Sequence, residues 1–534
     1  MSLKLFSNRP CIPNMPPEQD VELESLSDRS DVSEASDLSD QPDSPLVAPV
    51  VTQRQWPRPR WLAPVKPSTL RASTALVARR PVASLLLLVA AAYVLSCVLR
   101  RVPLLASPLP PYTGPHAVGS VDVEVPLPTP RLISHTTFDA TGKPAFELES
   151  VLFTFYYPVD AAVGPSLPAR PWMPKPISLT AEGYAKFAHA NIFLIRQLFT
   201  LALWLIVGGI TVPSRVDAPL LSSPEPLPVV VFSHGMASSR TDYTAYLGEL
   251  ASRGHVVAAV EHRDGSCPGT LVIVPGKQDR RLLHFSATEL RSVPPMDAQR
   301  LKAEQLAFRE AEVFEVVRLL DTINAGNASD VAASNSRPEG RTLHAWTSRL
   351  DLTRLTLGGH SYGATLALQA LARAPFPVAG GIVLDPGKSS GPLNPNASVP
   401  ILVVHSDSWS RQPSLFFGRP HFDVVRRLVR GILNRTGAAW FVTALGTSHP
   451  SVSDAPLIEP LLLRWATGAS MDAREALKGY VAVSVDFLRF LRTGKPEGLL
   501  AEPVTHDTYA SWVSEERMQS FQLARLWKIH VSSA

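Results

Sequence analysis

The pentapeptide Gly359-His360-Ser361-Tyr362-Gly363 is the part of this 534-residue sequence with the clearest chemical potential. It has the pattern G-x-S-x-G, in which a serine occupies a sharp turn between a strand and a helix and the flanking glycines relieve crowding. An apolar run at 352–357 precedes it, and an alanine- and leucine-rich run at 364–372 follows it. This context predicts a nucleophile elbow with Ser361 as the attacking group.

A serine nucleophile needs a base that takes its proton and a carboxylate that holds this base in the correct tautomer. In hydrolases with this elbow, the acid and then the base follow the nucleophile along the chain. His449 lies in the loop directly after the predicted last strand, 438–445, and is the predicted base. Asp385 and Asp407 each follow a predicted strand. Either could be the acid, and position alone does not decide between them.

Two backbone N–H groups must stabilise the negative oxygen that develops when a serine attacks an ester. One is predicted at Tyr362, directly after the nucleophile. The other is predicted at Met236, in the segment Ser233-His234-Gly235-Met236 that follows the first clear strand. Gly235 has no side chain, so the backbone can approach closely there.

Three other histidines are expected to have structural roles. His360 is expected to point away from Ser361, because the two residues are adjacent in the chain. His405 is expected to make a structural hydrogen bond at the end of a strand, and His421 to begin a helix.

Short apolar runs alternate with helical patterns after Pro228, which predicts an α/β fold with a mostly parallel sheet flanked by helices. The predicted strands are 229–232, 256–260, 352–357, 381–384, 401–404 and 438–445, and the predicted helices are 242–252, 297–323 and 364–372. Loops after parallel strands meet at one edge of the sheet, where they can bring the serine, the acid and the histidine together. The inserted stretches 264–295 and 325–348 could form a lid or only loops.

The composition excludes several classes of protein. Hydrophobic residues make up 45% and charged residues 18%, which is enough apolar content for one large or two moderate cores. The formal net charge is +4, without a basic stripe interleaved with aromatic residues, so no nucleic-acid partner is expected. Three scattered cysteines are too few for a disulfide framework or a four-cysteine zinc site. The 50 prolines predict long extended, looped or disordered stretches.

The amino-terminal part of the sequence predicts a tail and a membrane anchor. Residues 1–80 are rich in serine, proline and acidic residues and poor in aromatic residues, which predicts a disordered cytosolic tail. The uncharged run Val82 to Leu99 is about 18 residues, or about 27 Å as a helix, enough to cross a thin bilayer. We therefore expect a transmembrane signal anchor at 81–100. Basic residues are more numerous before it than after it, which places the amino terminus in the cytosol.

The segments expected after the anchor are a proline-rich stem at 101–143, a catalytic domain at 144–496 and a carboxyl-terminal extension at 497–534. Glycosylation sequons at Asn327, Asn396 and Asn434 all follow the predicted span, which agrees with a lumenal or exoplasmic catalytic domain. A second apolar stretch, Ile192 to Val212, is interrupted by a charged residue and leaves about 15 apolar residues, fewer than a span needs. It is expected to form a partly buried helix that dips into the membrane interface.

Three segments resemble the platelet-activating factor acetylhydrolases, both the plasma type and its intracellular relative: VVVFSHGMASSRTDYTAYLGELASRGHVVAAVEHRDGS, LTLGGHSYGATLALQAL and GGIVLDP. The similarity runs from about Pro144 to about Gly494. It implies an α/β-hydrolase fold with Ser361 as the nucleophile, Asp385 as the acid and His449 as the base. It also implies that the Met236 and Tyr362 amides form the oxyanion hole, and it favours Asp385 over Asp407.

The sequence departs from this family at several positions. Tyr362 and Ala364 stand where the family usually has phenylalanine and glycine, Pro386-Gly387 replaces an Ala-Trp pair after the acid, and Pro450 follows the base. These differences concern the selectivity for acetyl groups more than the implied chemistry. The predicted anchor also differs from the secreted and lipidated members and is more similar to fungal relatives.

The resemblance implies a calcium-independent serine esterase that needs no cofactor or metal. The expected substrate is a platelet-activating-factor-like phospholipid, from which the enzyme would remove an sn-2 acetyl or other short or oxidised acyl group. A carboxylesterase or lipase of broader specificity would use the same residues. A noncatalytic membrane scaffold with a hydrolase fold is a third hypothesis, although such proteins commonly lack one member of the triad.

Overall fold

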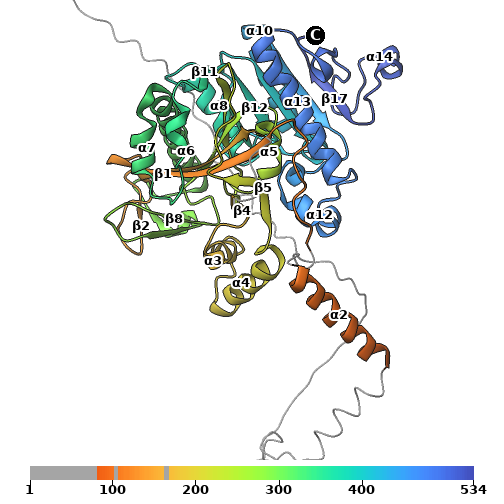
Figure 1. Cartoon of the computed structure of the whole chain (residues 1–534). Coiled ribbons are helices and arrows are strands. Elements are labelled where there is room, and N and C mark those ends of the chain that lie inside the picture. The colour runs from red at the N-terminus through yellow and green to blue at the C-terminus, as the bar shows by residue number, and fades with distance from the viewer. Residues whose placement is uncertain (1–80, 101–105, 161–166) are drawn as a thin grey trace, which may run out of the picture. The chain divides into compact units, whose positions relative to one another are not determined.

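A mixed eleven-stranded sheet organises the folded part of the chain (Figure 1). The structure, a computed structural model, describes residues 81–100, 106–160 and 167–534, so the predicted tail lies outside the described residues. In sheet order the strands are β17 (Trp527–Val531), β16 (Ala439–Ala444), β13 (Ile401–Ser406), β12 (Gly380–Leu384), β11 (Leu350–His360), β6 (Leu227–Ser233), β7 (Val256–Glu261), β3 (Glu147–Val159), β1 (Ala117–Leu132), β5 (Thr211–Val216) and β4 (Ala169–Pro171).

The centre of the sheet is parallel, and its edges contain antiparallel pairs. From β16 to β7 all neighbouring strands run parallel. Strands β17, β3 and β4 pair antiparallel with their neighbours. The predicted α/β fold with a mostly parallel centre is therefore confirmed. This strand order, with the nucleophile turn directly after β11, is that of an α/β-hydrolase fold.

Helices cover both faces of the sheet. One face carries α6 (Ala298–Thr322), α7 (Ala328–Ser334), α8 (Tyr362–Arg373) and α10 (His421–Thr436), and the other carries α5 (Thr244–Ala251) and α13 (Ala473–Thr493). The side chains of β6 alternate between the two cores: Val229 and Val231 face the first group of helices, and Val230 and Phe232 face the second. Because both faces are buried, the parallel strands are continuous apolar runs.

The sheet extends beyond the range predicted for the catalytic domain, 144–496, at both ends. Strand β1 lies in the segment predicted as a stem, and it pairs antiparallel with β3. Strand β17 lies in the predicted carboxyl-terminal extension, and its Ile529 pairs with Val442 of β16. The prediction that 438–445 is the last strand is therefore wrong. Strand β1 lies inside the sheet between β3 and β5, and β17 is an edge strand beside β16; composition alone does not reveal either pairing.

The predicted anchor residues form a helix, α2 (Pro81–Arg100), with several exposed leucines. In the part of the chain that the structure describes, no helix combines the length and the apolar character needed to cross a membrane. The predicted span at 81–100 is therefore not supported.

The second apolar stretch, Ile192 to Val212, is not one helix. Helix α4 (Phe193–Val207) ends before Gly208, and the chain then enters β5 at Thr211. Val207 is the buried side chain of α4, and the rest of the helix is exposed or half-buried, so α4 is a partly buried helix as predicted. It packs beside α3 (Ile177–Phe187).

Both inserted stretches are ordered. Residues 264–295 contain the hairpin of β8 (Gly269–Val272) and β9 (Arg280–Leu283), and Phe285 of this stretch is buried in the core. Residues 325–348 include α7 and the completely buried Trp346. The remaining helices are α9 (Asp407–Arg411), α11 (Ala455–Ile458), α12 (Pro460–Thr467) and α14 (Glu515–Ser520).

Replacing Ile529 tests whether β17 is part of the catalytic fold. Ile529 is 0% exposed, so Ile529→Ala should lower the free energy of unfolding by about 2–5 kcal/mol through the cavity it leaves. Leu526→Ala is the matched control, because Leu526 is 44% exposed and its loss should cost less than about 1 kcal/mol. Thermal melting of the full chain measures both. Equal melting temperatures for the two variants would contradict the integration of β17.

Candidate active site

The turn between β11 and α8 places Ser361 in a backbone conformation that residues with side chains rarely adopt. Its φ is 55° and its ψ is −116°. A Cβ atom at Gly359 would lie 2.3 Å from the carbonyl oxygen of Gly363, and one at Gly363 would lie 2.0 Å from that of Ser233. Because backbone atoms cannot yield by such amounts, only glycine fits at both positions. The pentapeptide therefore has the backbone geometry of the elbow that its sequence predicts.

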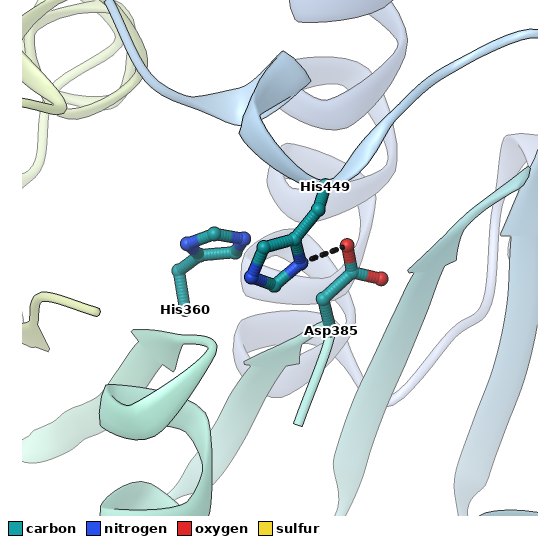
Figure 2. A group of neighbouring side chains, drawn as sticks. All are labelled: His360, Asp385 and His449. Atoms are coloured by element: carbon teal, nitrogen blue, oxygen red, sulfur yellow. Dashed lines mark hydrogen bonds and ion pairs between the residues drawn. The ribbon is translucent and has the colours of Figure 1, made fainter. Parts of the chain in front are cut away.

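Asp385 and His449 form a hydrogen-bonded pair beside the elbow (Figure 2). Asp385 directly follows β12 and is buried, and His449 begins the 3₁₀ turn His449–Val452 after β16. The Nδ1 atom of His449 lies 2.9 Å from Oδ2 of Asp385. A carboxylate at this distance holds the proton on Nδ1, so Nε2 is left as the nitrogen that can accept a proton.

Two serines that the sequence analysis did not identify hold this pair in place. The Ser406 backbone N–H donates to Oδ1 of Asp385 at 2.6 Å, and the Ser406 hydroxyl donates to Oδ2 at 2.7 Å. The Ser408 hydroxyl accepts a hydrogen bond from the His449 backbone N–H at 3.2 Å. The carboxylate therefore receives three hydrogen bonds, which fix its orientation toward His449.

Asp407, the alternative acid, has a different set of partners. Its carboxylate accepts hydrogen bonds from the Tyr509 hydroxyl and from the Gly446 backbone N–H, the latter at 3.2 Å. Gly446 belongs to the loop between β16 and His449. Asp407 therefore connects the carboxyl-terminal extension to the loop that carries the base, while Asp385 contacts the base itself.

The His449 ring lies between two other rings. Trp409 of α9 stacks on it with ring centroids 3.9 Å apart and an interplanar angle of 12°. The His360 ring lies on the elbow side, with centroids 4.4 Å apart (Figure 2). The expectation that His360 only points away from the site is therefore incomplete, because its ring contacts the predicted base.

Ser361 directly follows a residue whose ring contacts that of His449. Potential ligand atoms of His360, Asp385 and His449 all lie within 4.8 Å of one another, and Ser361 is the next residue after His360. Hydrogen bonds already engage both oxygens of Asp385 and one nitrogen of each histidine, which fits an acid–base pair better than a cation site. The hydrogen bonds of the described residues do not include one between Ser361 and His449. Such bonds often tighten only when substrate binds.

The two predicted oxyanion donors are available for a ligand. Among the hydrogen bonds of the described chain, none has the N–H of Met236 or of Tyr362 as its donor. Tyr362 is the first residue of α8, and N–H groups in a first helical turn have no partner within the helix. A Cβ atom at Gly235 would lie 3.2 Å from Cβ of Ser361, so the loop after β6 lies directly against the nucleophile.

Arg309 supports the loop after β6 from inside the protein, and its role was not predicted from the sequence. It is completely buried in α6 and pairs with Asp264 at 2.7 Å. It also donates to the His234 carbonyl at 2.8 Å, and its guanidinium group lies 4.3 Å from the centre of the Tyr362 ring. One side chain therefore contacts both segments that carry the predicted oxyanion amides.

A second serine, histidine and carboxylate arrangement lies inside the protein. Ser233 Oγ is 2.5 Å from Nε2 of His262, and Nδ1 of His262 is 2.7 Å from Glu312. Burial raises the pKa of Glu312 well above its usual value and lowers that of His262 well below its own. All three residues are buried, so no substrate can reach this serine. The arrangement therefore stabilises the end of β6 rather than acting as a catalytic site.

The remaining histidines are placed as predicted. His405 ends its strand with Nδ1 3.1 Å from the Ser410 hydroxyl, and His421 begins α10. Asn327, Asn396 and Asn434 are all exposed.

Comparison with known proteins identifies the family. A family model described as "Platelet-activating factor acetylhydrolase, isoform II" matches residues 105–496. The chain belongs to this family. The family that the sequence resemblance implied is thereby confirmed.

Several curated relatives are named "Platelet-activating factor acetylhydrolase". The Canis lupus familiaris protein is 31% identical over 166 residues, which is 31% of this chain and 36% of the relative. The Gallus gallus protein is 27% identical over 272 residues, which is 50% of this chain and 57% of the relative. The matched regions therefore span from about a third to just over half of these relatives.

Among solved structures, a ferulic acid esterase from Streptomyces cinnamoneus is similar to this chain. The two share 20% sequence identity with a TM-score of 0.47, and the match covers 74% of this chain and 96% of the esterase. The assignment of the fold rests on the strand order and the elbow of this chain itself.

Replacing Asp385 and Asp407 one at a time tests which of them is the acid. Asp385→Asn should lower kcat for an ester by about 10⁴-fold, because the amide no longer holds His449 in the required tautomer. Asp407→Asn keeps the size of the side chain and should lower kcat by less than about tenfold. Steady-state kinetics on a soluble chromogenic ester measure both. A larger loss in Asp407→Asn would contradict the assignment.

Proposed function

We propose that this chain is a serine esterase that hydrolyses the sn-2 acetyl or another short or oxidised acyl ester of platelet-activating-factor-like phospholipids. The observation that carries the proposal is the Asp385–His449 pair beside the Ser361 elbow. Membership of the acetylhydrolase family supports the substrate class.

In the proposed mechanism, Ser361 attacks the ester carbonyl carbon while Nε2 of His449 accepts the serine proton. The carbonyl oxygen becomes negative and accepts hydrogen bonds from the Met236 and Tyr362 amides. The tetrahedral intermediate collapses, the lysophospholipid leaves as an alcohol with the proton from His449, and the acyl group stays on Ser361. His449 then takes a proton from a water molecule that attacks the acyl carbon, and it returns this proton to the Ser361 oxygen as the carboxylic acid leaves. Asp385 keeps the His449 imidazolium oriented during both the formation and the hydrolysis of the acyl-enzyme.

This mechanism uses side chains and backbone amides alone, so a calcium-independent reaction without a cofactor stays our prediction. Hydrolysis in the presence of EDTA is its direct test. A broader carboxylesterase or lipase would share every residue named above and would differ in its preference for acyl length. The pairing of Asp385 with His449 beside the Ser361 turn favours an esterase over a noncatalytic scaffold, because such scaffolds commonly lack one member of the triad.

The preference for short acyl groups and the role of Ser361 as the nucleophile can be tested together. The full chain should hydrolyse sn-2 acetyl phosphatidylcholine much faster than a long-chain analogue, with EDTA present. Ser361→Ala should reduce the rate on the order of 10⁶-fold, as expected when the nucleophile of a triad is lost. Serine-dependent cleavage without a preference for acetyl groups would favour a general lipid esterase. Full activity of Ser361→Ala would disprove the mechanism.

We also infer that α4 docks on the lipid surface that holds the substrate. Phe193, Leu194, Leu198, Leu201 and Trp204 of α4 are all exposed. A groove of about 760 Å³ between this helix and the start of α3 is lined partly by Leu201 and Trp204. Burying such side chains in a bilayer is favourable by about 1.5–3 kcal/mol each. Helix α12, which follows the loop of the base, exposes Leu461 and Trp465 as well.

Charge on α4 should separate membrane docking from catalysis. Leu201 is 52% exposed, and Leu201→Asp should lower turnover on phosphatidylcholine vesicles by about tenfold or more while leaving a soluble ester unaffected. Leu205→Asp should act in the same direction. Met518→Asp in α14 is the control, because Met518 is 46% exposed on a helix without buried residues. Equal losses on vesicles and on the soluble ester would show that α4 serves the fold and not the interface.

The topology inferred from the sequence stays a prediction. It places the amino terminus in the cytosol and the catalytic domain in the lumen or outside the cell. Modification of Asn327, Asn396 or Asn434 would require this arrangement, and their exposure permits it.

A further inference from the structure

A buried tyrosine and a buried histidine connect the oxyanion loop to the base. The Gly235 backbone N–H donates a hydrogen bond to the hydroxyl oxygen of Tyr243 at 3.2 Å. The same hydroxyl lies 2.9 Å from Nδ1 of His360. The His360 ring in turn lies against the His449 ring, with centroids 4.4 Å apart. A continuous path of contacts therefore runs from the loop after β6 to His449.

These contacts favour one tautomer of His360. The Tyr243 oxygen accepts from Gly235, and its single proton is then available for Nδ1 of His360. Burial and the neighbouring His449 keep the pKa of His360 well below its usual value, so the ring is neutral. A neutral imidazole that accepts at Nδ1 carries its proton on Nε2.

The Nε2–H group of His360 faces the residue that acts as the base. Nε2 is buried and has no hydrogen-bond partner in the described chain. The backbone of His449 lies close to His360 and partly counteracts the lowering of the His360 pKa. The contact does not meet the geometry of a hydrogen bond. The Nε2–H group of His360 can form a hydrogen bond with the His449 backbone when substrate binds, because catalytic hydrogen bonds shorten in the complex.

We propose that Tyr243 and His360 are positioning residues for His449: Tyr243 holds His360 as the neutral Nε2–H tautomer, and His360 supports the loop and ring of the base. A neutral ring beside His449 also adds no repulsion when His449 becomes an imidazolium. A positively charged ring there would oppose this step. The inference rests on the proposed esterase function, because it assigns a role within the same site.

Tyr243→Phe tests the proposal with little change in shape. The variant loses both hydrogen bonds of the hydroxyl, so kcat on a soluble ester should fall by about tenfold while KM changes by less than about twofold. Labelling of Ser361 by a fluorophosphonate should slow by a similar factor, since labelling needs the base. A kcat equal to that of the unmodified chain would overturn the proposal.

Tyr246→Phe is the matched control on the same segment. Tyr243 and Tyr246 are both 1% exposed, and the Tyr246 hydroxyl makes a buried hydrogen bond of 2.7 Å to Ser484, away from the site. Both variants should melt at a lower temperature than the unmodified chain, but Tyr246→Phe should keep its kcat. Equal losses of kcat in both variants would show that the effect reports stability alone and would overturn the proposal.

Two variants at His360 give a second test. His360→Leu removes the Nε2–H donor and should lower kcat by about tenfold to a hundredfold. His360→Gln can place an N–H group near the same position and should recover at least part of this loss. Equal activity of the two variants would overturn the role of the donor. Failure of the unmodified chain to hydrolyse any ester would instead refute the proposed function, so the two failures are distinguishable.

Discussion

The backbone turn at Ser361 is the constraint on which the rest of the site depends. A residue with a side chain at a φ of 55° costs of order 1–3 kcal/mol, so neighbouring contacts must hold it. The Ser361 N–H donates to the Leu384 carbonyl at 2.9 Å, and Gly363 lies directly against the backbone of Ser233. The conformation that exposes the hydroxyl therefore also fixes the end of β12, which leads to Asp385, and the loop that carries the oxyanion amides.

The central strands could be predicted from the sequence because a parallel strand buried on both faces is a continuous apolar run. Strands β1 and β17 could not. Strand β1 contains Pro126, Pro128 and Pro130, which indicate an irregular stem until the pairing with β3 is known. Strand β17 has five residues and follows a polar stretch, and its stability depends on β16, which lies more than eighty residues earlier in the chain.

The candidate nucleophile, the candidate base and the two candidate acids could be selected from their place after predicted strands. The residues around them could not, because Ser406, Trp409 and Tyr243 act through contacts between distant segments. Arg309 did leave a signal. Gln305, Arg309 and Glu312 recur at helical spacing in α6, and all three are buried. Polar residues repeated among the apolar residues of a helix's buried face indicate a buried network.

The contact between Asp407 and Tyr509 has a consequence for the order of folding during synthesis. Asp407 binds Gly446 in the loop before the base, and Tyr509 is translated long after both. Strand β17, which completes the sheet beside β16, emerges later still. Before Tyr509 and β17 emerge from the ribosome, the turn at Ser361 can already form, but the loop of His449 lacks these supports. The nascent chain should therefore complete the candidate site only after β17 has emerged, and the unpaired edge of β16 is the surface that needs protection until then.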